Sequence, residues 1–121
     1  MQTIENSIID LELEMQWAKI CKKIALDFDK KEVDLETILM LIGIQECGII
    51  KSKYTKEQKQ DLMHVAVCSL LTPIGCFEYL HTDADGWKHY KAKATVLELT
   101  GDSQENVLKR QVIDYFKTMN Y

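Results

Sequence analysis

The chain has 121 residues, a length that fits one folded unit, and we predict a single compact domain over residues 1–121. Its 15 basic and 19 acidic residues give a formal charge of −4, so no basic surface for nucleic acid is expected. The longest apolar run, ILMLIGI at 38–44, is far shorter than the about 20 residues of a membrane span. The initial MQTIENSIID lacks the pattern of a signal peptide. We therefore expect a cytoplasmic protein with no membrane partner and no nucleic-acid partner.

The four cysteines show no pattern that calls for disulfides or metal. Cys21, Cys47, Cys68 and Cys76 contain no C-x-x-C pair, and nothing in the chain indicates secretion. We expect all four thiols to be reduced.

A long amphipathic helix is predicted in the first segment. Ser7, with Asp10 three residues later, fits the cap at its start. Its apolar residues recur every three or four positions and form one stripe: Ile9, Leu13, Trp17, Ile20, Ile24 and Phe28. Acidic residues precede lysines along this segment, which is the order that the helix macrodipole favours.

A second helix, LETILMLIGIQEC, is predicted after Asp34, a residue suited to its N-cap. Because this helix is apolar almost all round, we expect it to be the most buried element. Gly43 inside it indicates the close approach of a neighbouring backbone. Gly48 fits a left-handed C-terminal position and would place Ile49 over Ile44, as in a Schellman motif.

The third helix begins with a capping box formed by Thr55 and Gln58, and its boundary is predicted at Thr72, before a proline. Asp61, His64 and Cys68 follow one another at helical spacing on the side that we predict to lie opposite the core. One D-x-x-H pair supplies too few ligands for a metal, and a cysteine near a helix C-terminus is a poor nucleophile. These three residues are predicted to lie on a binding surface.

An antiparallel hairpin is predicted where CFEYLH and WKHYKAK flank TDADG. Asp83 to Gly86 suits a type I turn with glycine in the left-handed position. A three-residue loop pairs His81 with His89, whereas a two-residue loop pairs His81 with Tyr90. The two histidines alone make a poor zinc site.

A calcium loop anchored on Gly86 would have Ala92 where a glutamate is required. We therefore predict no metal and no cofactor, and we place His81, Trp87 and His89 on the binding surface.

The last third contains TVLEL, which fits a third short strand, and then a final helix capped by Asp102 or Ser103. That helix carries its apolar residues at helical spacing: Leu108, Val112, Tyr115, Phe116 and Met119. The predicted fold class is mainly α with a minor β part. It is a four-helix domain with a small antiparallel hairpin or three-stranded sheet before the last helix.

Four segments between about Ile38 and Tyr90 resemble a family of small uncharacterised bacterial proteins. They are LIGIQECG, YTKEQKQDLMHVAVCSLL, GCFEYL and DADGW. The resemblance implies a small bacterial cytosolic protein. It implies no activity, cofactor or site residue.

No nucleophile elbow, P-loop or dinucleotide-binding motif occurs in the sequence. We therefore predict a non-catalytic binding or regulatory module that acts through protein–protein contacts, its partner being an unknown protein or a second copy of the chain. The alternative is a metal-assisted enzyme or small-ligand binder that uses the third helix and the hairpin histidines. The predicted binding surface comprises Asp61, His64, Cys68, His81, Trp87 and His89.

Overall fold

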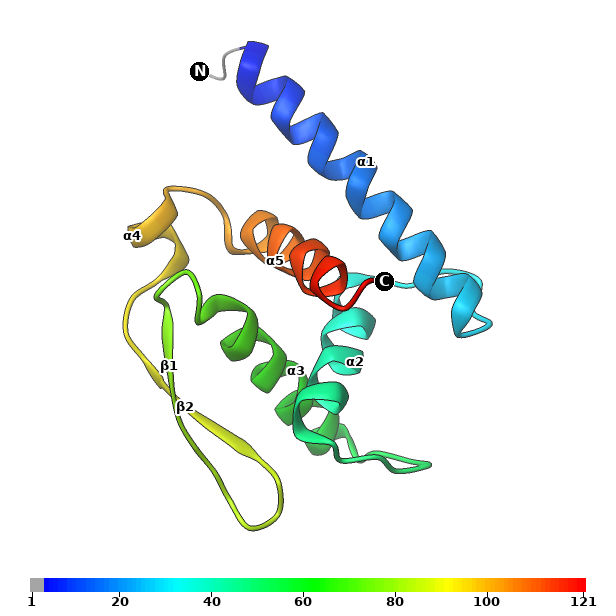
Figure 1. Ribbon diagram of the computed structural model, residues 1–121, viewed down its shortest axis with the longest axis vertical. Coiled ribbons are helices and arrows are strands. Elements are labelled where there is room, and N and C mark those ends of the chain that lie inside the picture. The colour runs from blue at the N-terminus through cyan, green and yellow to red at the C-terminus, as the bar shows by residue number, and fades with distance from the viewer. Residues whose placement is uncertain (1–3) are drawn as a thin grey trace.

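Figure 1 shows the computed structural model, which describes residues 4–121, with side chains described from residue 11 onward. The elements follow in the order α1 (Ile4–Asp27), α2 (Leu35–Cys47), α3 (Lys56–Leu71), β1 (Phe77–Thr82), β2 (Lys88–Ala92), α4 (Val96–Thr100) and α5 (Gln104–Thr118). The predicted fold class is confirmed, with an antiparallel two-stranded hairpin before the last helices. Over residues 4–121, no helix has both the length and the apolar character of a membrane span.

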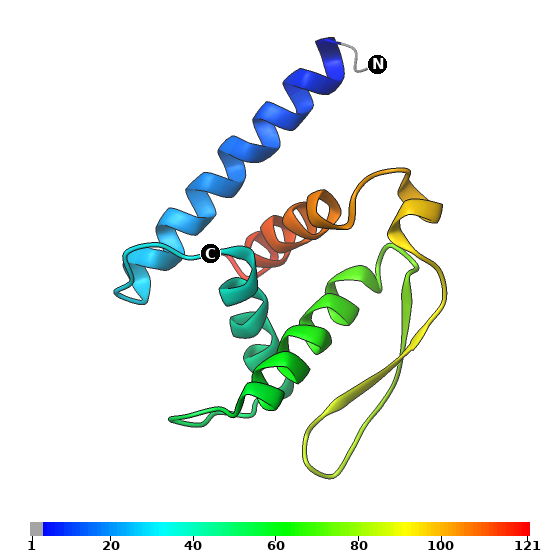
Figure 2. The same cartoon turned by 180° about the vertical axis from the view of Figure 1, so that it is seen from behind.

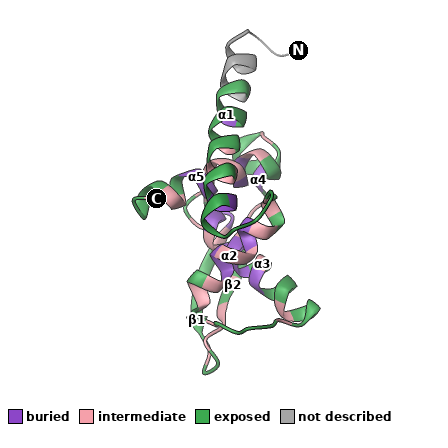
Figure 3. Cartoon of the chain, turned by 90° about the vertical axis from the view of Figure 1, so that its right-hand side faces the viewer, coloured by how far each residue is buried: buried purple, intermediate pink, exposed green. Residues whose placement is uncertain are grey.

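Helices α2 and α3 form the most extensive pair, and α5 packs on α3. Helix α1 lies along one side, where it contacts α5, and the hairpin lies beside α3 (Figures 1 and 2). Buried residues gather where α2, α3 and α5 meet, as Figure 3 shows. The core cluster consists of Ile24, Ile38, Leu39, Ile42, Ala66, Leu70, Leu71, Cys76, Val96, Val107, Leu108 and Val112.

Helix α1 buries the predicted stripe in part. Leu13 and Ile24 are buried, whereas Phe28 lies just beyond the helix end and is 53% exposed. The helix begins at Ile4, so the predicted start at Ser7 is wrong. No helix breaker stands at positions 4 to 6, and the helix therefore extends further than the capping pattern indicated. The side chains of Ser7, Ile9 and Asp10 lie outside the described ones.

Helix α2 has the predicted boundaries, but it is not the central, most buried element, because α3 packs on α2, α5 and both strands and holds more buried residues. The Asp34 carboxylate accepts a hydrogen bond of 2.9 Å from the Thr37 amide. At the other end, Gly48 has φ 67° and donates its amide to the Ile44 carbonyl at 2.8 Å. This bond defines the simpler left-handed cap, so the predicted Schellman motif is wrong. Along α2 only Glu36 and Gln45 are exposed, which agrees with a helix covered by its neighbours.

Gly43 marks the closest contact between α2 and α3. A Cβ atom built on Gly43 would lie 2.1 Å from the Leu62 carbonyl oxygen and 2.6 Å from its carbon. The predicted backbone approach is therefore confirmed, and its partner is α3.

Helix α3 starts with the predicted capping box. The Gln58 amide donates to Thr55 Oγ1 at 3.1 Å, and the Thr55 amide donates to Gln58 Oε1 at 3.0 Å. The predicted orientation of one residue is wrong, because Cys68 is only 1% exposed. The side of α3 opposite the α2 contact is covered by the hairpin, a long-range contact that helical spacing alone does not reveal.

The hairpin has the three-residue loop. His81 pairs with His89 and Thr82 with Lys88, while a bulge between Tyr79 and His81 shifts the register toward the open end. The Gly86 amide donates to the Asp83 carbonyl at 3.1 Å, and Gly86 has φ 94°, so the turn is built as predicted.

The chain after the hairpin differs from the prediction at two points. TVLEL forms the short helix α4, because Thr95 caps it by accepting a hydrogen bond from the Glu98 amide at 3.2 Å. The predicted third strand is therefore wrong. At α5, Ser103 is the N-cap, and its Oγ accepts from the Asn106 amide at 3.2 Å. Asp102 instead forms an ion pair of 2.7 Å with Arg110.

Gly86→Val is expected to lower the free energy of unfolding by about 1 kcal/mol or more, because a β-branched residue resists the positive φ of this position. A Cβ would also come within 3.4 Å of the Cys47 carbonyl oxygen. Ala84→Val, in the same loop without a positive φ, is the control. Urea unfolding of both variants measures the difference, and equal stabilities would contradict the strained-turn explanation.

Candidate binding site

The three predicted residues on α3 lie in different environments. Asp61 and His64 are exposed, whereas Cys68 is buried. The Cys68 sulfur lies 3.5 Å from His64 Nε2, and the His64 ring meets the Phe77 ring edge to face at 6.4 Å. Desolvation raises the pKa of the Cys68 thiol to about 11. The thiol is therefore held in its neutral form, which is a weak nucleophile.

We expect Cys68 to react slowly with iodoacetamide at pH 8 in the native protein, because it is both buried and protonated. Cys47, which is half-buried, is the internal comparison and should be labelled first. Mass analysis of peptides from a labelling time course measures both rates. Labelling of Cys68 as fast as that of Cys47 would contradict the expectation.

The predicted hairpin residues form a group of their own. The His81 and His89 rings stack across the strands with centroids 4.7 Å apart, and His89 Nε2 lies 2.9 Å from Asp83 Oδ2. Trp87 is half-buried, and its amide donates to Asp83 Oδ1 at 3.0 Å. The His89 hydrogen bond, followed by those from the backbone, lowers the pKa of Asp83. These contacts organise the turn itself.

The structure does not join the α3 residues and the hairpin histidines into one site. In the part of the chain with described side chains, no hydrogen bond or ring contact links Asp61 or His64 to His81 or His89. Among these same residues, no group of three or more His, Cys, Asp or Glu side chains is arranged to hold a metal ion. Carboxylate, amide, hydroxyl and apolar side chains meet instead at another surface, between α2, α3 and α5.

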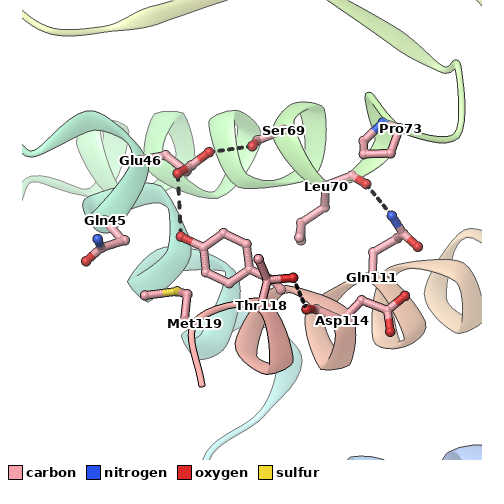
Figure 4. A pocket seen from close by; sticks show the side chains of 10 residues that line it. Gln45, Glu46, Ser69, Leu70, Pro73, Gln111, Asp114, Thr118 and Met119 are labelled. Atoms are coloured by element: carbon pink, nitrogen blue, oxygen red, sulfur yellow. Dashed lines mark hydrogen bonds between the residues drawn. The ribbon is translucent and has the colours of Figure 1, made fainter. Parts of the chain in front are cut away.

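A cavity of about 420 Å³ opens between α2, α3 and α5. Its lining combines carboxylate, amide and hydroxyl groups with a few apolar side chains (Figure 4). The lining residues are Gln45, Glu46, Ser69, Leu70, Pro73, Gln111, Asp114, Tyr115, Thr118 and Met119. Among the residues that the structure describes, the lining therefore holds two carboxylates and no lysine, arginine or histidine.

Glu46 connects three elements at this cavity. Ser69 donates to its Oε1 at 2.6 Å, and the Tyr115 hydroxyl donates to Oε2 at 3.5 Å. Lys88 of β2 places its Nζ 3.7 Å from the same Oε1. Burial, and then the Glu46 charge, raise the pKa of Tyr115 to about 12, so the phenol stays a donor. Glu46 is thus fixed in position by groups from α3, α5 and the hairpin.

A second cavity, of about 330 Å³, shares a wall with the first. Gln45, Tyr115 and Met119 line both cavities. The remaining lining residues of the second are apolar or aromatic: Ile24, Phe28, Leu41, Ile42, Ile44, Phe116 and Tyr121. We call the two adjoining cavities the α2–α5 groove.

The sequence predictions missed this groove, although one signal pointed to it. Glu46 is an acidic residue in the last turn of α2, where the negative end of the macrodipole disfavours a carboxylate. Residues that break such a local rule are often functional. Its partners Ser69 and Tyr115 are 23 and 69 residues away, and no spacing pattern relates them.

No protein-family model, curated protein or solved structure matches this chain. The resemblance to small bacterial proteins therefore stays a prediction.

Proposed function

We propose that the protein is a non-catalytic binding module whose α2–α5 groove receives an amphipathic helical segment of a partner protein. The observation that carries the proposal is the adjacency of an apolar cavity and an acidic cavity with a common wall. A partner helix with apolar residues on one face and a basic residue at one end matches both parts.

The apolar part of the groove supplies the affinity. Phe28 and Met119 stand at its rim and are 53% and 48% exposed, and Tyr115 and Phe116 form part of its wall. Covering such side chains contributes about 25 cal/mol for each Å² removed from water. A depression between two helices suits a third helix that inserts residues at spacings of three and four.

The acidic part of the groove determines the orientation of the bound segment. Glu46 already accepts from Ser69 and lies near Lys88, whereas Asp114 is exposed and forms no ion pair among the described side chains. A lysine or arginine of the partner placed at Asp114 would gain a charge-assisted hydrogen bond. This requirement fixes the direction in which the segment lies.

The test is a selection of displayed peptides of about 16 residues, long enough for four helical turns, on the immobilised wild-type protein. Enriched peptides should share apolar residues at helical spacing and a basic end. Their affinity should fall at least tenfold with Met119→Lys. Asp114→Asn should weaken only the peptides with a basic end.

Leu97→Lys is the matched control for Met119→Lys. Leu97 is 69% exposed on α4, outside the groove, so its replacement makes the same kind of change on another surface. Peptides that bind Met119→Lys and Leu97→Lys equally well would contradict the proposal. A selection that enriches no binding peptide would contradict it as well.

A further inference from the structure

Helix α1 carries a second apolar stripe that the folded chain leaves uncovered. Leu11, Met15 and Leu26 are 62%, 60% and 73% exposed. Ala18 and Lys22, also exposed, complete the stripe at steps of four, three, four and four. At about 100° per residue, these five positions lie within about 80° of one another. They form one continuous strip along the helix.

This strip lies on the opposite side of α1 from the core. Leu13 and Ile24, the buried residues of the core-facing stripe, are about 180° around the helix from the strip. Figures 1 and 2 show α1 along one side of the molecule, with α5 on its inner side. The strip therefore faces away from α5, and at its C-terminal end Lys22 and Leu26 border a shallow depression shared with residues 30–33.

The first four positions of the strip have the spacing of a coiled-coil seam, whereas Leu26, seven residues after Lys19, lies beside the seam. Met15 and Lys22 stand seven residues apart, as do Leu11 and Ala18, which corresponds to alternating a and d positions of a heptad. Glu12 and Lys19 flank the seam on one side, again seven residues apart. Neither forms an ion pair within the part of the chain whose side chains are described.

The charges on α1 are complementary to those of an inverted copy of the same helix. When two such helices pair antiparallel, the same flank of each meets the same flank of the other, so Glu12 of each faces the region of Lys19 of the other. On the opposite flank, Glu14 is already held by Lys109 at 3.1 Å. Among the side chains described on this flank, the unpaired acidic Glu12 is thus matched by the unpaired basic Lys19 of a second copy.

A parallel pair is disfavoured by Lys22. In parallel coiled coils equivalent a positions meet, so Lys22 would face Lys22 of the other chain. In the antiparallel arrangement a positions face d positions, and the aliphatic stem of Lys22 covers Leu11 of the other copy.

We propose that two copies of this chain associate through α1 in an antiparallel coiled coil whose seam is formed by Leu11, Met15, Ala18 and Lys22, with Leu26 beside it. This inference does not depend on the α2–α5 groove. One helix pair buries less than the about 800 Å² per partner of a standard interface. The association should therefore be reversible, with a dissociation constant in the micromolar range.

The test is sedimentation velocity of the full chain from about 1 to 500 µM, a range that brackets a micromolar equilibrium. The wild type should shift from monomer to dimer, and Met15→Lys should weaken the dimer at least tenfold. Gln16→Lys adds the same charge at the neighbouring exposed position outside the strip and should leave the dimer in place.

Charge reversals test the orientation and leave the apolar strip intact. Glu12→Lys and Lys19→Glu should each weaken the dimer, and the double variant should restore it. In a parallel pair Glu12 and Lys19 do not face each other, so restoration would not occur. The proposal is overturned if the wild type stays monomeric throughout the range, if Met15→Lys dimerises like the wild type, or if the double reversal fails to restore association.

Discussion

Gly43→Ala is expected to destabilise the fold by about 3 kcal/mol. The added methyl group overpacks a close backbone contact, and this effect outweighs the stabilisation from the higher helix propensity of alanine. The new Cβ would stand 2.1 Å from the Leu62 carbonyl oxygen. Backbone cannot rotate away as a side chain can, so α2 and α3 must move apart. Urea unfolding followed by circular dichroism measures the loss.

Gln45→Ala is the matched control for this change. Gln45 lies two residues away on α2 and is exposed, so its replacement alters propensity without crowding α3. Its free energy of unfolding should stay within about 0.5 kcal/mol of the wild type. In an exposed helix, Gly→Ala stabilises by about 1 kcal/mol. A stabilising effect of Gly43→Ala would show that the two helices are not in backbone contact.

Ile24→Ala should cost about 3 kcal/mol, because it removes a fully buried side chain and leaves a cavity where α1 meets the core. Thermal or urea unfolding measures the loss.

Leu26→Ala separates burial from helix propensity. Leu26 lies on the same helix but is 73% exposed, so its truncation should change stability by less than about 0.5 kcal/mol. Both variants are compared at a protein concentration low enough for the chain to be monomeric. Equal losses for Ile24→Ala and Leu26→Ala would mean that α1 is not anchored by the face that the structure buries.

Local signals predicted the fold where a short segment determines the structure. The Asp34 cap, the Thr55–Gln58 capping box and the turn at Gly86 each depend on a few neighbouring residues, and each is present. The strand predicted for TVLEL was wrong because the apolar pattern of so short a segment fits a strand and a helical turn equally well. Thr95, three residues before Glu98, was the signal that favoured the helix.

The site was harder to predict because it depends on contacts between distant segments. Helical spacing placed Cys68 away from α2 but did not reveal that the hairpin covers it. Likewise, Glu46, Ser69 and Tyr115 meet only after three helices pack. A sequence read locally identifies which residues share a helix face, whereas the neighbour that covers the face is a property of the whole fold.

Binding of a partner segment in the α2–α5 groove is tested most directly by a two-dimensional amide NMR titration of the wild-type protein with the tightest selected peptide. We expect the largest shift changes at Gln45, Tyr115 and Met119, with little change at Trp87 and the hairpin histidines. The largest changes at His81, Trp87 and His89, with an undisturbed groove, would contradict it and place binding on the hairpin.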